Sequence, residues 1–373
     1  MFWWETGNAW VLSRYDDVAA ATRDHRFSTD ERADAQERLA GEDEDTPLIR
    51  LANHSLLRAS DEGHQRLRRL LSPSFSARAM EQWRVDIQRI VDETLDELGE
   101  ADRVDVVSQF ADLVPFRVVT RMLRIPPEHE ATFRGFSSAL IDFIMLPWLG
   151  TEEIDRFVRF IPQGADLLNE LIAARRRERG DDLLSTLIHF EEQGDRLSTD
   201  ELTSLIATLI PASNDSTVLL VAFTILDLLR HPEQKRLVLE DPRLLRDALD
   251  EVMRFEGFVK TTIPRHARED VEIRGTTIRR GQTLYPLLAS AMHDPDVIAD
   301  PGVFDVRRNQ TRSLGFGIGP HFCLGSSQAR LVGMIAVGTF FARFPAIQLA
   351  GEPVFARHIA LRKMVSLPVA LRP

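Results

Sequence analysis

The only cysteine of the 373-residue chain, Cys323, lies in the glycine-rich segment FGIGPHFCLG at residues 316–325, just before a helix-forming stretch. Backbone N–H groups and the dipole at a helix N-terminus stabilise a thiolate, so Cys323 could be a nucleophile or a metal ligand. A lone cysteine is more often a small buried side chain. Gly317, Gly319 and Gly325 favour the chemical role, because they let the backbone approach a flat, bulky group.

The surroundings of Cys323 narrow the choice of chemistry. A zinc site needs three or four Cys or His ligands at short spacings, and His321 is the one histidine in this segment. A cysteine hydrolase needs a paired base, and the segment carries no such signature. The remaining option is a single thiolate as the axial ligand of a haem iron.

The segment resembles the haem-binding loop of the cytochrome P450 family. That loop has a Phe, two spaced glycines, a basic residue two before the cysteine and a glycine two after it, and further motifs follow the family's order over nearly the whole chain. The resemblance implies that Cys323 ligates the iron of haem b (iron protoporphyrin IX). It also implies that Phe316, Gly317 and Gly325 shape the loop around the cofactor.

Most of the chain has the periodicity of helices, so the predicted fold class is mainly α with small β-sheets. The predicted helices span residues 15–24, 77–99, 127–143, 152–178, 199–230, 242–256 and 326–343. Strand patterns occur at 8–13, in a hairpin over 271–285, and in an edge strand over 364–373. The resemblance implies the cytochrome P450 fold, with haem between a long central helix and the cysteine loop with its helix.

Composition indicates a soluble globular protein. Hydrophobic residues make up 44% of the chain and charged residues 28%, and no linker divides it, so we expect a single domain over residues 1–373. The net charge of −11 argues against a nucleic-acid partner. The start, MFWWETGNAW, has neither a signal peptide nor a membrane anchor, which indicates a cytoplasmic protein like the soluble bacterial branch of the family, with an N-terminus that is short for that branch.

The segment 199–230 predicts a buried central helix with a polar middle. Ser198 and Glu201 have capping-box spacing at its start, and apolar residues then occupy nearly every face. Five consecutive polar residues at 213–217 interrupt this pattern after Pro211, which lacks a backbone donor. An apolar helix with such a centre is expected to face a cavity or a ligand.

The polar centre, PASNDSTV, resembles the oxygen-activation motif of the family. By position, Asp215 stands for the acid and Ser216 for the usual threonine, and Ser213 replaces the usual glycine. The resemblance implies that an alcohol holds an ordered water while the acid relays protons from solvent. Serine lacks the methyl group that restricts the rotamer of threonine, so looser positioning is expected.

Glu251 and Arg254 lie one helical turn apart, and Arg308 follows at the spacing that the family shows. The resemblance implies that these three residues form a structural network that braces the cysteine loop.

Four basic residues match family positions that bind the haem propionates: His64, Arg68, Arg265 and His321. Each of them alone could equally be a surface charge. Ser313 stands where the family usually has a further histidine, with Arg312 next to it.

Arg66 and Arg69 lie on the helix of His64 but point away from its face, by the 100° step per residue. They could present positive charge to an acidic redox protein, a ferredoxin or flavodoxin, although solvated arginines are the ordinary interpretation.

Three segments occupy positions that line the pocket of the family, at 31–58, 138–150 and 258–263. Their apolar side chains suggest an apolar pocket, with a few polar contacts. The candidate lining residues are Phe143, Trp148, Phe258 and Val259, with Ser213, Asn214 and Lys260 as polar members.

The leading interpretation is a haem-thiolate monooxygenase of specialised metabolism. It would insert one oxygen atom of O2 into a largely apolar, small or medium-sized organic substrate, as a monomer, with NAD(P)H electrons delivered by a ferredoxin or flavodoxin and its reductase. One alternative is oxidative coupling or cyclisation without oxygen insertion. Another is a non-enzymatic haem-binding protein, which the pairing of Asp215 and Ser216 disfavours.

Overall fold

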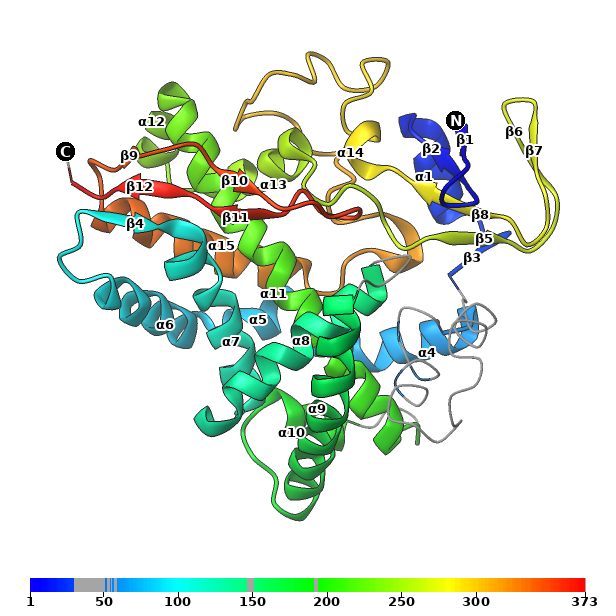
Figure 1. The fold of residues 1–373 in the computed structure, drawn as a ribbon, viewed down its shortest axis with the longest axis horizontal. Helices are drawn as coiled ribbons and strands as arrows, with labels where there is room; N and C mark the ends of the chain where they lie inside the picture. Colours follow the sequence, from blue (N-terminus) through cyan, green and yellow to red (C-terminus); the bar gives the residue numbers. More distant parts are fainter. Residues whose placement is uncertain are drawn as a thin grey trace.

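Helices make up most of the molecule in the computed structural model, and short strands gather along one side of it (Figure 1). The structure describes residues 1–29, 51, 54, 56, 59–145, 151–190 and 194–372.

The helices largely follow the periodicity of the sequence. The predicted helix at 77–99 is divided by a turn at residues 82 and 83, and the other predicted helices are confirmed with shifts of a few residues at their ends. The helices are α1 (Tyr15–Arg23), α4 (Asp61–Leu71), α5 (Ala77–Glu81), α6 (Arg84–Glu97), α7 (Leu113–Leu123), α8 (Glu130–Met145), α9 (Thr151–Arg177), α10 (Leu183–His189), α11 (Thr199–Arg230), α12 (Pro232–Glu240), α13 (Leu244–Glu256), α14 (Leu288–Ala291) and α15 (Ser326–Arg343).

In the part of the chain that the structure describes, the strands form four small sheets. The largest has the order β1-β2-β8-β5-β3, and β2 pairs with β8 in parallel. The others are β4-β12-β9, β10-β11 and β6-β7. The strands are β1 (Phe2–Trp4), β2 (Ala9–Leu12), β3 (Phe27–Ser28), β4 (Arg103–Asp105), β5 (Arg265–Ala267), β6 (Val271–Ile273), β7 (Thr276–Ile278), β8 (Thr283–Pro286), β9 (Gln348–Leu349), β10 (Val354–Phe355), β11 (Met364–Ser366) and β12 (Pro368–Ala370).

Two strand predictions need correction. The hairpin over 271–285 forms only as β6 and β7, while β8 belongs to the large sheet. The predicted C-terminal edge strand is two strands in different sheets, and β12 has a neighbour on each side. Pro368 begins β12, so its missing N–H does not interrupt the ladder. Pairing with β4 and β9 depends on residues far away in sequence, which a local pattern does not contain.

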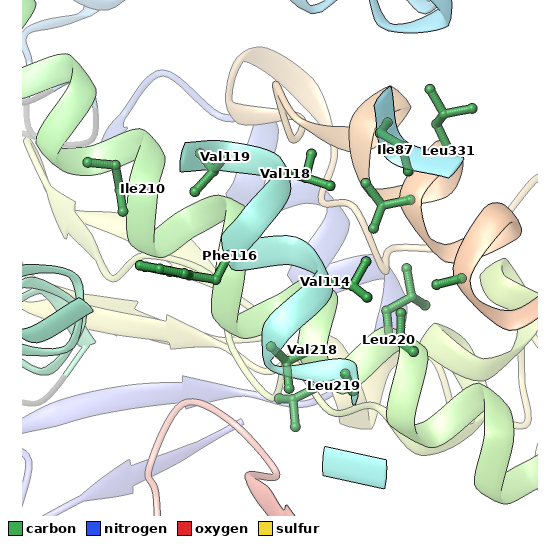
Figure 2. Packing of buried hydrophobic residues seen from close by; sticks show 14 of the residues in the cluster. Ile87, Val114, Phe116, Val118, Val119, Ile210, Val218, Leu219, Leu220 and Leu331 are labelled. Carbon is green, nitrogen blue, oxygen red and sulfur yellow. The ribbon is translucent and has the colours of Figure 1, made fainter. Parts of the chain in front are cut away.

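Helix α11 is the centre of the hydrophobic core. It contacts α7, α8, α9, α13 and α15, and nearly all its side chains outside the polar middle are buried. Figure 2 shows the side chains of α7 and α11 packing together beside α6 and α15, with Val114, Phe116, Val118 and Val119 from α7 and Ile210, Val218, Leu219 and Leu220 from α11. By length and composition this helix could cross a membrane, but most of its apolar stretch is buried, as in a core helix.

The start of α11 confirms the predicted capping box. The Ser198 side chain accepts from the Glu201 N–H, and the Glu201 carboxylate accepts from the Ser198 N–H. Pro211 lies inside the helix without ending it. Tight packing on several sides keeps α11 helical through a residue that would interrupt an isolated helix.

Asp227, near the C-terminal end of α11, is a buried acid whose ionisation lowers the stability of the folded state. The residue is 1% exposed, and its Oδ2 atom has no hydrogen-bond partner among the described residues. Burial raises the pKa of Asp227 to about 8, although the charges of Arg230 and Arg362 oppose that shift. Between about pH 4 and pH 8 the folded state therefore binds a proton that the unfolded state has released, so stability falls as the pH rises through this window.

We expect Asp227→Asn to stabilise the protein at about pH 8.5 by a few kcal/mol and to have little effect near pH 4, since each pKa unit is worth about 1.4 kcal/mol. Urea unfolding of both proteins across this range measures the difference. Asp200→Asn, which removes an exposed acid from the same helix, is the control. A stabilisation that does not change with pH would show that Asp227 is not the titrating group.

Candidate functional site

The Cys323 loop folds back on itself before α15. The Cys323 N–H donates to the carbonyl of Phe316 at 2.8 Å, and the Phe322 N–H donates to the carbonyl of Gly319 at 3.0 Å. Gly317 and Gly319 have φ of 72° and 74°, in the left-handed region that favours glycine. The sequence uses glycine where this tight loop requires it, and Cys323 is thereby held just before the helix N-terminus.

Arg330 of α15 fixes the loop from the other side. Its guanidinium lies 4.1 Å from the centroid of the Phe316 ring. It also binds Asp250 of α13, with Nε 2.8 Å from Oδ1. One arginine therefore joins α13, α15 and the aromatic residue that opens the loop.

The Cys323 thiol is reachable by solvent although protein atoms surround most of it. Burial raises its pKa, against the Gly325 N–H and the positive charges of Arg68 and Arg330, which lower it. Desolvation is the larger effect, so the pKa of the free thiol lies above its usual range, and a metal ion bound at the sulfur would favour the thiolate.

Four basic side chains from three parts of the chain meet near this loop. His64 of α4 stacks on His321, with ring centroids 4.0 Å apart and planes 28° apart. The positive charges of Arg68, also on α4, and of Arg265 on β5 act on both rings. Arg265 is 1% exposed. The structure brings together the four basic residues that the sequence singled out.

The two histidines of this cluster are neutral at pH 7. Burial, followed by the positive neighbours, lowers the pKa of His64 to about 4 and that of His321 to about 3. The charge of the cluster is therefore carried by Arg68 and Arg265, while the rings offer neutral N–H donors. Thr29, which the sequence did not single out, lies with its Oγ1 3.4 Å from Nε2 of His321.

Glu251 is fully buried and accepts hydrogen bonds from several donors. Arg254 binds it through two nitrogens, Nε at 2.8 Å and Nη2 at 2.9 Å. Arg308 Nε lies 3.2 Å from Oε1, and the Asp305 N–H donates to the same oxygen at 3.0 Å. Gln310, which sequence reasoning missed, donates to Oε2 at 2.9 Å.

This network joins α13 to the segment before the cysteine loop. Arg254 also donates to the carbonyls of Pro301 and Val303, and Arg308 to those of Ala299, Asp300 and Val303. Two arginines thus satisfy an irregular stretch of backbone that lacks strand or helix partners.

The middle of α11 is less fully covered than the apolar stretches on either side of it. Ala212 is exposed, and Ser213, Asp215 and Ser216 are half-buried. The Ser216 hydroxyl donates to the carbonyl of Ala212 at 3.1 Å. Asn214 is buried, and its Oδ1 has no hydrogen-bond partner among the described residues. The polar centre therefore has unused acceptor capacity inside the molecule.

Several predicted pocket residues have other partners. Phe258 is 1% exposed and stacks on Phe223 of α11 with centroids 5.6 Å apart, so it is a core residue rather than a surface open to a ligand. The Lys260 ammonium donates to the carbonyl of His358 at 2.7 Å. Val259 is half-buried and pairs with Leu361.

The remaining pocket predictions lie outside the described residues. These are the side chain of Phe143, Trp148, and most of the segment 31–58.

The predicted docking role of Arg66 is not supported. Its guanidinium binds Asp195 at 2.8 Å and Glu201 at 2.5 Å, so its charge is neutralised within the protein. Arg69 is more exposed and lies 3.9 Å from Asp195. The helical step indicates where these side chains point but not which acids meet them.

The residues around Cys323 fit a metal that brings most of its own ligands. Among the described residues no group of three or more His, Cys, Asp or Glu side chains could hold a metal ion. One sulfur beside a cluster of basic side chains suits a flat, metal-bearing group with anionic edges.

Comparisons with known proteins agree with this chemistry. The family model "Cytochrome P450" matches residues 2–354. The chain is 40% identical to the epothilone C/D epoxidase of Sorangium cellulosum, covering 100% of this chain and 90% of the relative. It is 35% identical to the 6-deoxyerythronolide B hydroxylase of Saccharopolyspora erythraea, covering 98% and 90%.

The fold agrees as well. The crystal structure of epothilone D-bound cytochrome P450epoK superposes with a TM-score of 0.90 at 39% identity, over 100% of this chain and 93% of that one. The chain therefore belongs to the cytochrome P450 family: it is a haem b-dependent monooxygenase that uses O2 and reducing equivalents from NAD(P)H, passed on by redox partners, to oxidise a small organic molecule.

Proposed function

We propose that this monooxygenase oxidises a largely apolar secondary metabolite of the polyketide type, with Cys323 as the axial ligand. The observation that carries the assignment of Cys323 is its position, in a glycine loop beside the His64, Arg68, Arg265 and His321 cluster. A relative named as a polyketide biosynthesis cytochrome P450 supports the substrate class, beside relatives named as an epothilone C/D epoxidase and a 6-deoxyerythronolide B hydroxylase.

In this proposal the basic cluster holds the two carboxylates of the haem. Arg68 and Arg265 supply charge, and the stacked rings of His64 and His321 supply N–H donors. When bound, the haem supplies the iron at which O2 is activated. Phe316, Gly317 and Gly325 would shape the loop around the haem, with the two glycines allowing a close approach of the backbone.

We propose that Ser216 and Asp215, in the middle of α11, supply protons to the reaction. Because the Ser216 hydroxyl donates to the Ala212 carbonyl, its lone pairs are available to accept from a water molecule. Ser216 would therefore hold a water in place, while Asp215, next to it, exchanges protons with solvent.

The partner and the cellular setting are also proposals. We infer a soluble, cytoplasmic monomer that receives electrons from a ferredoxin or flavodoxin. A solved relative, P450BioI, is described in complex with a fatty acid ligated to an acyl carrier protein. Substrate delivery on a carrier protein is therefore worth testing beside free substrates.

Epothilone D and myristic acid, which relatives bind in their crystal structures, are suitable first probes. Mass spectrometry of products formed with NADPH, a surrogate ferredoxin and its reductase tests the reaction. A product heavier by one oxygen atom supports insertion, whereas loss of hydrogen alone would indicate coupling or cyclisation.

The ligand assignment predicts a spectroscopic result. Reduced wild-type protein with carbon monoxide is expected to show the Soret shift of a thiolate-ligated haem, and Cys323→Ser is expected to lose it while keeping the circular dichroism of the fold. Persistence of the shift in Cys323→Ser would contradict the assignment.

The Glu251 network predicts a loss of cofactor. Glu251→Gln removes the charge that buried Arg254 and Arg308 share, at a cost of about 3–5 kcal/mol. The ratio of haem to purified protein is expected to fall strongly, with a lower unfolding midpoint. Glu240→Gln, at an exposed acid paired with Arg236, is the control and should behave as wild type. Full haem loading in Glu251→Gln would refute a bracing role.

Ser216→Ala is predicted to raise the hydrogen peroxide released per NADPH consumed, because the water that supplies protons loses its anchor. Haem content and the carbon monoxide spectrum should not change. Ser216→Thr keeps the hydroxyl and should match or improve on wild type. An unchanged peroxide yield in Ser216→Ala would argue against this role.

A further inference from the structure

A cation from the C-terminal part of the chain reaches the polar centre of α11. Lys363 lies directly before strand β11, and its Nζ is 3.8 Å from Oδ2 of Asp215. The Asp215 side chain is 19% exposed and that of Lys363 is 37% exposed. The pair is therefore partly open to solvent, next to the half-buried Ser216.

The backbone around Lys363 is held firmly. The Lys363 carbonyl accepts from the Ala356 N–H at 2.9 Å, which extends the ladder between β10 and β11. On the other side, the Arg362 N–H donates to the carbonyl of Phe258 at 2.8 Å, and the Lys260 N–H donates to that of Ala360 at 2.8 Å. Backbone hydrogen bonds from two neighbouring segments therefore fix the position of the Lys363 backbone, from which its side chain extends.

Further ion pairs fasten the same region to the helices. Arg362 binds Glu256 of α13 and lies over the rings of Phe223 and Phe355. Arg230 of α11 binds Glu352 at 3.0 Å. Figure 1 shows β10 and β11 lying alongside α11, in agreement with these contacts. Residues 352–366, which we call the C-terminal clasp, therefore follow α11 over several turns.

Two of the contacts of the Asp215 carboxylate come from Asn214 and Lys363. On the Asn214 side, Nδ2 lies 3.4 Å from Oδ1, a weak contact. On the other side the Lys363 ammonium attracts Oδ2. The Lys363 ammonium carries a full charge of opposite sign, so it attracts Oδ2 through space at 3.8 Å, while the amide of Asn214 makes only a long contact.

We propose that Lys363 is a positioning residue: it orients Asp215 so that this acid stands between solvent and Ser216 for proton supply. The inference rests on the proposed role of Asp215, and it adds the clasp as the element on which that role depends. Within the part of the chain that the structure describes, the ion pair of the Lys363 ammonium is with the Asp215 carboxylate, so we infer that Lys363 acts through that acid.

The test uses haem-loaded protein with NADPH, O2, a surrogate ferredoxin and its reductase, without any organic substrate. Hydrogen peroxide per NADPH and the solvent deuterium isotope effect on NADPH consumption are measured for Lys363→Gln, Lys363→Arg, Asp215→Asn and the double variant. Arg357→Gln, at an exposed cation on the same clasp, is the matched control. The thermal unfolding midpoint of each protein provides a readout independent of turnover.

Lys363→Gln is expected to change the hydrogen peroxide per NADPH and the solvent isotope effect in the same direction as Asp215→Asn does. The expected change is about threefold, which is small beside the roughly hundredfold change that loss of a general acid can cause. Lys363→Arg should restore wild-type values, and Arg357→Gln should not differ from wild type. In the Asp215→Asn background, Lys363→Gln should have no further effect on the ratios or on the midpoint, since the partner is already lost.

Three results would overturn the inference: unchanged ratios in Lys363→Gln while Asp215→Asn alters them, equal effects of Lys363→Gln in both backgrounds, or an equal effect of Arg357→Gln. A wild-type protein without the thiolate spectrum, or an Asp215→Asn variant with wild-type ratios, would instead refute the proposed function on which the inference rests.

Discussion

The buried carboxylate of Glu251 is the interaction on which the geometry around Cys323 depends. A single charge at full burial would be costly, and here it is offset by two guanidinium groups, a backbone N–H and the Gln310 amide. The same arginines satisfy carbonyls of the irregular stretch that leads to the cysteine loop. Asp250 of α13 also binds Arg330. Both ends of the cysteine loop are therefore anchored to the same helix, α13.

The charges near the cysteine loop favour the binding of anions, while repulsion among the basic side chains stays small. Four cations in one buried place would oppose folding, but two members of the basic cluster are histidines that burial keeps neutral. Arg68 and Arg265 then retain the charge beside the stacked rings. The Cys323 thiol lies in the field of Arg68, which favours the thiolate once a metal is present.

Local sequence patterns predicted the helices and several site residues. Contacts between segments far apart in sequence determined which other side chains join the site. The sequence predicts α11 almost completely, from the periodicity of residues 199–230 and the capping spacing of Ser198 and Glu201. Motif positions likewise brought His64 and His321 together. No local signal distinguishes Gln310 or Lys363 from surface residues, because their partners, Glu251 and Asp215, come from helices far away in sequence.

The basic cluster joins parts of the chain that fold as separate elements: α4, strand β5 of the large sheet, and the loop before Cys323. It is complete only when the sheet has docked against α4. A cofactor that binds these groups in the folded protein alone stabilises that docking by mass action. If the cluster holds the haem carboxylates as proposed, the cofactor would be a structural clamp between sheet and helices, and its loss should loosen this junction before it affects the core around α11.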